Sequence, residues 1–169
     1  MVECALISTP MVTNCKLSKN DDSPLLDAKL YRSMIGSLLY LTASRPDIMQ
    51  VVGMVARFQS CPKASHVLAI KRIFKYLNST CDYGLWYPKS KRFDLTTYTD
   101  ADWASNIDDR KVTSGNAFFL GECLVGWSNR KQSSVSMSTA EVEYIVTAKC
   151  CTQVLWMKQS LEEVQVEYK

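Results

Sequence analysis

The hydrophobic pattern of this chain changes its period near residue 81 and becomes helical again near residue 138. Before residue 81 apolar residues recur every three or four positions, as on one face of a helix; between these two points they alternate or form short clusters, as in strands. We predict three consecutive helices within residues 27–80, then short strands, then one long helix from 138 to about 163. This order predicts an α/β or α+β domain preceded by a helical segment.

Local signals set the expected boundaries of these elements. Ser44 is expected to cap the second helix, with Pro46 in its first turn. Residues 83–87 are a predicted short strand that ends at Pro88, and Gly121 with Glu122 forms a predicted hairpin turn. The long final helix is expected to bury one face, made of Val142, Ile145, Ala148, Thr152 and Leu155.

Composition limits the chemistry that these 169 residues can support. The single histidine, His66, excludes a multi-histidine metal site, so metal-dependent hydrolysis would rest on carboxylates, which favour Mg²⁺ or Mn²⁺ over Zn²⁺. The seven cysteines are odd in number and include no Cys-x-x-Cys, which favours reduced thiols. With no signal peptide or membrane-length apolar run visible, we expect an intracellular protein of the cytoplasm or nucleus.

Charge is unevenly distributed around the net value of +3. Residues 57–92 hold eight basic side chains against one acidic side chain, and Tyr76, Tyr83, Trp86 and Tyr87 lie among them. One interpretation is a surface that contacts a phosphate backbone and stacks on bases. The other is a solvated helix face beside a buried aromatic cluster, and both interpretations stay open.

Two acidic motifs are the strongest candidates for chemistry. Asp100 and Asp102 end a predicted strand, where carboxylates can hold a divalent cation at a sheet edge, although both can also begin a turn. Glu141 follows Ser138 with the spacing of a capping box, so it can serve the helix start or face the Asp100 strand and share its metal. Glu143 lies about 200° further around the helix, so it cannot face the same site.

Basic pairs flank these motifs. Arg110 with Lys111 and Arg130 with Lys131 are predicted to lie in loops beside the strands, where they are candidates for phosphate contacts. His66 has no nucleophile elbow to serve anywhere in the chain, and we interpret it as structural.

Two ordered groups of motifs run along the chain. The first consists of YRSMIGSLLYL at residues 31–41, RPDI at 45–48, His66, KRI at 71–73 and YL at 76–77. The second consists of YTDADWA at residues 98–104, TSG at 113–115, WS at 127–128, KQ at 131–132 and STAEVEY at 138–144. The first group resembles the stretch after the polymerase domain in copia-type retrotransposon Pol proteins. The second resembles the ribonuclease H domain that follows it.

The resemblance implies a fold, an activity and a metal. The fold is ribonuclease H-like, a mixed sheet with flanking helices in residues 83–169, preceded by a helical connection segment at 27–82 and an irregular segment at 1–26. The activity is hydrolysis of RNA in RNA–DNA hybrids with two Mg²⁺ ions, or Mn²⁺, held by four acids. Asp100 matches the first acid and Glu141 the second, whereas Asp102 belongs to the motif without a catalytic role.

The sequence departs from the family pattern after Glu141. The third acid of the family lies in a Cys-Asp-Asn-like segment on a later strand and the fourth lies beyond it, and neither is found before Lys169. We therefore expect an incomplete sheet, little or no nuclease activity, and a tendency to associate with itself or with the rest of Pol. The alternative is a non-catalytic module that binds nucleic acid or protein like an effector, or a remnant without a selected role. No membrane partner is expected.

Overall fold

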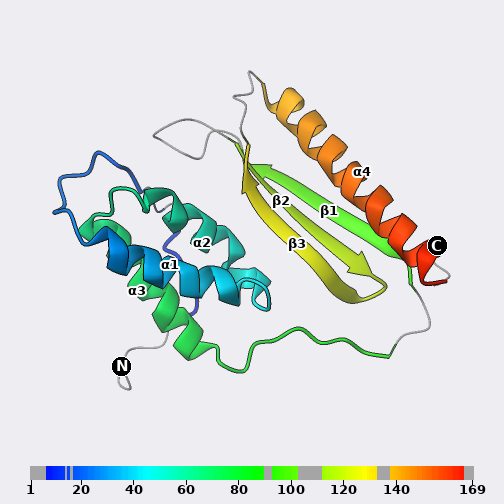
Figure 1. Cartoon of the computed structure of the whole chain (residues 1–169), viewed down its shortest axis with the longest axis horizontal. Coiled ribbons are helices and arrows are strands. Elements are labelled where there is room, and N and C mark those ends of the chain that lie inside the picture. Colours follow the sequence, from blue (N-terminus) through cyan, green and yellow to red (C-terminus); the bar gives the residue numbers. More distant parts are fainter. Residues whose placement is uncertain are drawn as a thin grey trace. The chain divides into compact units, whose positions relative to one another are not determined.

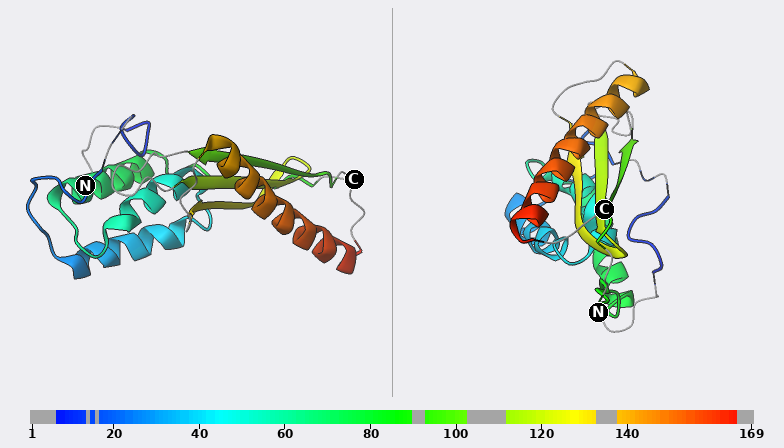
Figure 2. Two further views of the ribbon diagram at one scale, coloured as in Figure 1. Left: turned by 90° about the horizontal axis from the view of Figure 1, so that it is seen from above. Right: turned by 90° about the vertical axis from the view of Figure 1, so that its right-hand side faces the viewer.

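The computed structural model describes residues 7–13, 15, 17–89, 93–102, 112–132 and 138–165. The chain divides into two compact units, Met1–Gly84 and Leu85–Lys169. The first, here called the helical unit, contains helices, and the second, the sheet unit, contains three strands and one long helix (Figures 1 and 2). The predicted mixture of helices and strands is confirmed, as four α-helices and a three-stranded antiparallel sheet in the described residues.

The helical unit holds three α-helices, as the apolar periodicity predicts. They are α1 (Ala28–Leu41), α2 (Met49–Val55) and α3 (Ala64–Ser79). The second predicted helix is divided, because the 3-10 turns η1 (Pro46–Ile48) and η2 (Ala56–Phe58) flank α2. The Asp27 carboxylate caps α1 by accepting a hydrogen bond of 2.8 Å from the backbone N–H of Lys29.

A continuous hydrophobic core joins the three helices. It contains Tyr31, Ile35 and Leu38 from α1, Val52 and Val55 from α2, and Ile70 and Ile73 from α3, all with no exposed surface. Full burial of a large apolar side chain stabilises a fold by about 1.5–3 kcal/mol. The buried Tyr31 hydroxyl donates a 2.7 Å hydrogen bond to the carbonyl of Val55, so its polar atom has a partner inside the core.

The entry to η1 corrects the expected cap at Ser44. The Ser44 hydroxyl donates back to the carbonyl of Leu41 at 3.3 Å, and Arg45 occupies the N-cap without a side-chain cap bond. Arg45 instead forms a bidentate ion pair with Asp47, at 2.9 and 2.7 Å, and donates to the Thr80 carbonyl at 3.0 Å. This nearly buried guanidinium ties η1 to the end of α3, which is a tertiary contact that no local signal encodes.

The sheet unit is built on the strands β1 (Leu95–Asp102), β2 (Thr113–Leu120) and β3 (Cys123–Lys131). They pair antiparallel in the order β1-β2-β3. The predicted hairpin turn between β2 and β3 is confirmed, and Gly121 there has a φ of 60°, which suits glycine. The predicted strand at 83–87 is wrong: this segment has no ladder partner among the described residues, although the Tyr87 hydroxyl donates to the Leu124 carbonyl at 3.0 Å.

The long helix α4 (Thr139–Glu163) packs against β1 (Figure 1). Its buried residues are Val142, Val146 and Cys150, spaced by four. The predicted buried face is therefore correct only at Val142, and Leu155 is 67% exposed. The sheet covers only a narrow strip of α4, so apolar residues elsewhere on the helix stay in contact with solvent. Among the described helices, none has both the length and the apolarity that crossing a membrane requires.

Candidate functional site

Asp100 lies in the last half of β1, where it pairs with Gly115 of β2, and its side chain is exposed. The Sγ of Cys150 on α4 lies 3.6 Å from the Oγ1 of Thr97, which places Thr97 on the helix-covered face of the sheet. Successive strand residues point to opposite faces, so Asp100 belongs to the other face. The side chain of Asp102, the other acid of this motif, lies outside the described residues.

Glu141 lies in the first turn of α4, also exposed. The Ser138 hydroxyl accepts a hydrogen bond of 3.2 Å from the Glu141 backbone N–H, so the predicted cap is confirmed. A carboxylate in this turn is stabilised by the positive end of the helix dipole. Ser138 therefore caps α4, and Glu141 lies in the first turn that it caps.

The packing of α4 on β1 brings the two acids to the same end of the sheet unit. In Figure 1, α4 runs opposite to β1 and begins near the end where β1 finishes. Measured from the Thr97–Cys150 contact, Asp100 lies about 10 Å along the strand and Glu141 about 14 Å along the helix, in the same direction. The structure thus brings the two sequence-predicted acids to neighbouring levels, one on each side of the strand end.

Asp100 and Glu141 do not form a shared metal site by themselves, because they lie on opposite faces of the sheet at this end. Carboxylate oxygens suit Mg²⁺, which is usually held by one or two carboxylates together with water and substrate phosphate. In the described parts of the chain, no group of three or more His, Cys, Asp or Glu side chains could hold a metal ion. A pair of ions needs more ligands than Asp100 and Glu141 provide.

The predicted phosphate-contacting pairs have different outcomes. Arg110 and Lys111 lie outside the described residues. Arg130 and Lys131 are not in a loop as predicted: they are the last two residues of β3, paired with Ser114 and Thr113 of β2. The backbone continues the ladder through this pair because β2 offers a partner there.

A groove on the helix-covered side of the sheet was missed by sequence reasoning. It has a volume of about 670 Å³ and lies between β2, β3 and the second half of α4, including Lys149 and Trp156. The only sequence signal is the spacing of Lys149, Gln153 and Trp156, which places three side chains along one side of a helix. The strand residues that complete the groove are too far away in sequence for any motif to join them.

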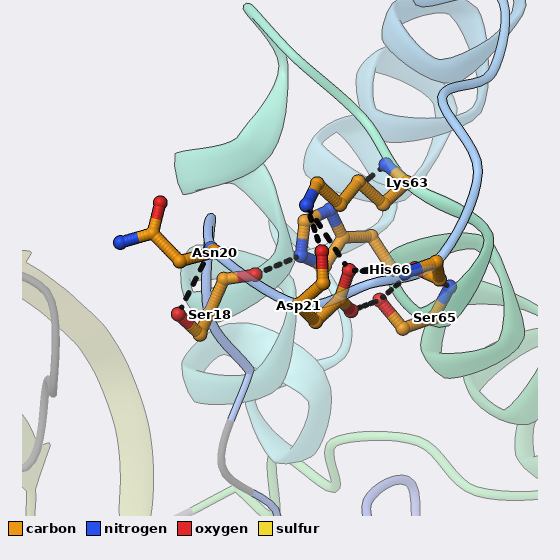
Figure 3. A network of polar contacts seen from close by, with 7 residues as sticks. Ser18, Asn20, Asp21, Lys63, Ser65 and His66 are labelled. Atoms are coloured by element: carbon orange, nitrogen blue, oxygen red, sulfur yellow. Dashed lines mark hydrogen bonds and ion pairs between the residues drawn. The ribbon is translucent and has the colours of Figure 1, made fainter.

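His66 occupies a structural position, as its isolation in the sequence predicts. It is fully buried, stacks on Phe58 with ring centroids 3.9 Å apart, and accepts a 3.1 Å hydrogen bond at Nδ1 from the Lys63 N–H. Its Nε2 lies 3.0 Å from the Ser18 carbonyl, so this nitrogen carries the proton (Figure 3). Both ring nitrogens are thus used to hold the N-terminal segment against the start of α3.

The same network includes Asp21. Its carboxylate accepts hydrogen bonds from the Ser65 and Ser23 hydroxyls and pairs with the Lys63 ammonium (Figure 3). The hydrogen bonds from Ser65 and Ser23 hold the pKa of Asp21 well below its ordinary value. These groups pair with one another, so the network fixes the chain rather than offering a vacant site.

Similarity to curated proteins covers almost the whole chain. It is 36% identical over 166 residues to the retrovirus-related Pol polyprotein from transposon RE1 of Arabidopsis thaliana, covering 98% of this chain and 11% of that polyprotein. It is 35% identical over 170 residues to the corresponding polyprotein from transposon TNT 1-94 of Nicotiana tabacum, covering 96% and 13%. The chain therefore spans only about an eighth or less of these polyproteins.

A shorter relative is matched over nearly its full length. The chain is 37% identical over 128 residues to secreted RxLR effector protein 161 of Plasmopara viticola, covering 75% of this chain and 90% of that protein. No family model and no solved structure matches the chain.

Proposed function

Because the chain belongs to the retrovirus-related Pol polyproteins of copia-type transposons, we propose that its sheet unit is an incomplete ribonuclease H domain. The helical unit is then the connection segment that follows the polymerase domain. The observation that carries this proposal is the placement of Asp100 and Glu141 at one end of the β1–α4 pair. These are the two positions that match the first two acids of the family motifs.

The proposed family activity is hydrolysis of the RNA strand of RNA–DNA hybrids. Mg²⁺ or Mn²⁺ supplies an activated water and charge stabilisation for the leaving oxygen in that reaction, and Asp100 and Glu141 match two of the acids that would hold it. Each of these exposed carboxylates attracts the cation. Arg130 and Lys131, at the end of β3, are proposed phosphate contacts of the same domain, and Arg110 and Lys111 are proposed with them on the sequence motif alone.

We propose that hydrolysis by these 169 residues is weak or absent. Two carboxylates do not complete a two-metal site, and each catalytic ion contributes separately to the attacking and leaving oxygens. Two acids on opposite faces of the sheet leave a metal ion and the substrate poorly positioned, and misplacement by about 1 Å can cost a hundredfold in rate.

The test is incubation of the purified chain with a labelled RNA–DNA hybrid and Mg²⁺ or Mn²⁺. We expect no cleavage above that of the Asp100→Asn variant, with Asp94→Asn as a matched control on an exposed acid just before β1. Robust cleavage that disappears in Asp100→Asn and persists in Asp94→Asn would contradict the proposed loss of activity. It would also require another chain or a second copy to complete the site.

A second candidate is a non-catalytic interaction module. It is favoured by the relative from Plasmopara viticola, which is named an effector and is covered over 90% of its length by the match. A salt-dependent binding assay separates the candidates, because nucleic-acid contacts weaken steeply with salt. Preference for the hybrid over DNA and RNA duplexes supports the nuclease-derived surface, whereas absence of nucleic-acid binding at low salt supports a protein partner.

We propose that the isolated chain associates with itself. β1 and β3 are the edge strands of the sheet in the described residues, and unpaired edges tend to pair with other chains. Large apolar side chains are also exposed on the sheet unit, including Tyr98 at 63% and Leu155 at 67%. Analytical ultracentrifugation is expected to show dimers or larger species, and a monodisperse monomer would contradict this.

A further inference from the structure

The groove on the helix-covered side of the sheet has the size of a ligand site. Its volume is about 670 Å³, within the usual range of about 300–1,000 Å³ for sites that hold small molecules. Ser114 and Asn116 of β2 and Arg130 of β3 form part of its floor, and Lys149 and Trp156 of α4 form its wall. These residues all belong to the sheet unit.

The positive charge of the groove favours an anionic ligand. Three cationic residues line it, Arg130, Lys131 and Lys149, and none of its described lining residues is acidic. A concave surface that carries one sign of charge concentrates ligands of the opposite sign. Arg130 and Lys149 are both exposed, so their charged groups can reach a bound phosphate without moving a core element.

The groove also contains Gln132, a buried amide whose side chain has no hydrogen-bond partner among the described residues. Its side chain is 2% exposed, and neither its Nε2 nor its Oε1 has a hydrogen-bond partner among the described residues. Buried amides are normally paired, so an unpaired donor and acceptor side by side indicate a group that arrives from outside. Such a group must present an acceptor and a donor together.

Trp156 supplies the third property of the groove, an accessible aromatic face. It lines the groove and yet is 62% exposed. An indole ring in this position offers a flat apolar surface on which another planar group can stack. Base stacking on aromatic side chains is a general means of holding single-stranded nucleic acid.

We propose that this groove binds a short single-stranded nucleic acid, with one base stacked on Trp156 and the edge of another base of the same strand paired with Gln132. Phosphates between these bases lie against Lys149 and Arg130. A base provides both the planar face and the donor–acceptor edge, whereas an acidic peptide provides the charge without this combination. The proposal rests on the proposed function for the class of ligand, and one end of the groove, at Arg130 and Lys131, reaches the level of Asp100.

The test measures binding of a fluorescent ten-nucleotide oligothymidylate and of the matching oligouridylate to the full chain by anisotropy. Trp156→Ala is expected to weaken binding by about five- to a hundredfold, as loss of one stacked base does. Lys149→Gln is expected to reduce the slope of log affinity against log salt by about 0.7, the value for one phosphate contact on a single strand.

Matched controls come from the same helix. Tyr144→Ala removes an aromatic ring that is 79% exposed and does not line the groove, and Lys158→Gln removes a cation half a turn around α4 from Lys149. Neither should change the affinity. Gln132→Met should weaken binding while leaving the melting temperature unchanged or raised, because it replaces an unpaired buried amide with an apolar group.

Three results would overturn the proposal. They are equal affinity of all variants for the oligonucleotides, equal losses in the groove and control variants, or tighter groove-dependent binding of labelled oligoglutamate than of either oligonucleotide. Hybrid cleavage is measured separately with Asp100→Asn, so failure of the groove leaves the nuclease proposal standing. Likewise, absence of cleavage leaves the groove measurement intact.

Discussion

The two units of this chain bury their apolar residues to very different extents. The helical unit has one core with residues from all three helices, and Ile35, Leu38, Val52, Ile70 and Ile73 have no exposed surface there. The core cluster of the sheet unit consists, among the described residues, of Val112, Val142 and Val146. A three-stranded sheet with one helix has too little buried surface to match the helical unit, although the two units are of similar length.

The comparison teaches that the acids we propose as functional lie in the unit with the smaller core. Asp100 and Glu141 occupy the sheet unit, while the hydrogen-bonded group of Arg45, Asp47 and Tyr76 belongs to the helical unit. We expect two unfolding transitions, with the sheet unit first. Further Pol sequence, a second copy or a bound nucleic acid would stabilise the sheet unit by mass action.

The largest expected effect is on the core of the helical unit. Leu38→Ala should destabilise that unit by about 2–5 kcal/mol, because it removes a fully buried side chain and leaves a cavity. Leu39→Ala, at a neighbouring residue that is 45% exposed, should change it by about 0.5 kcal/mol or less. Urea unfolding followed by hydrogen exchange measures the free energy of unfolding of each unit. Equal losses of stability in the two variants would contradict the buried position of Leu38 in the core.

The second effect concerns the ion pair of the helical unit. Arg45→Met should cost about 1–2 kcal/mol at neutral pH, because it removes the buried donor to the Thr80 carbonyl and the ion pair with the exposed Asp47. Circular dichroism during urea unfolding measures the loss. An unchanged transition midpoint would show that the ion pair contributes nothing to this unit.

Acid should remove the stabilisation that the Arg45–Asp47 ion pair gives to the helical unit. Burial acts to raise the pKa of Asp47, but the hydrogen bonds from Arg45 and Tyr76 outweigh it and the net pKa is lowered. Stability from this group is therefore complete above the ordinary Asp pKa of about 3.9 and is lost as the pH falls through the lowered value of the folded state. Asp47→Asn should be less stable at neutral pH and vary less between pH 4 and 2, whereas Asp22→Asn should follow the original protein.

A comparable effect is expected in the core of the sheet unit. Val146→Ala removes two buried methyl groups and should cost this unit about 1–2 kcal/mol. Thr147→Ala, at the adjacent exposed residue of α4, is the control and should be near neutral. Hydrogen exchange should show faster opening of α4 with unchanged protection in α3, and a joint loss of protection would mean that the units unfold together.

The smallest effect comes from a matched pair of helix caps. Ser138→Ala on α4 and Asp27→Ala on α1 each remove one side-chain bond to a backbone N–H, worth about 1 kcal/mol. Each change should lower only the transition of its own unit. If Ser138→Ala lowered both transitions equally, the division into two separately stable units would be wrong.

Much of the local structure could be predicted, because it depends on signals that are close together in the sequence. The helices at α1 and α3 follow from their apolar spacing, the turn at Gly121 from its glycine, and the start of α4 from Ser138. The predictions were wrong where contacts with residues that are distant in the sequence determine the local structure. The segment at 83–87 has strand composition without a ladder partner in the described structure, and Arg130 and Lys131 continue β3 because β2 pairs with them.

The candidate site divides in the same way. The motifs containing Asp100 and Glu141 named two acids from sequence, and only the packing of Cys150 on Thr97 shows that they share an end of the sheet unit. The groove could not be predicted, because Gln132, Lys149 and Trp156 are joined only when α4 crosses the strands. No local periodicity indicates that the Gln132 amide is buried without a partner.

By itself the sequence determined the order of the helices and strands and the family to which the chain belongs. Tertiary structure decided which face of α4 is buried, where the cations of β3 lie, and that Arg45 serves the core rather than a helix cap. The physical reason is that periodicity and capping act over a few residues. Burial, in contrast, is set by whichever distant surface covers a side chain.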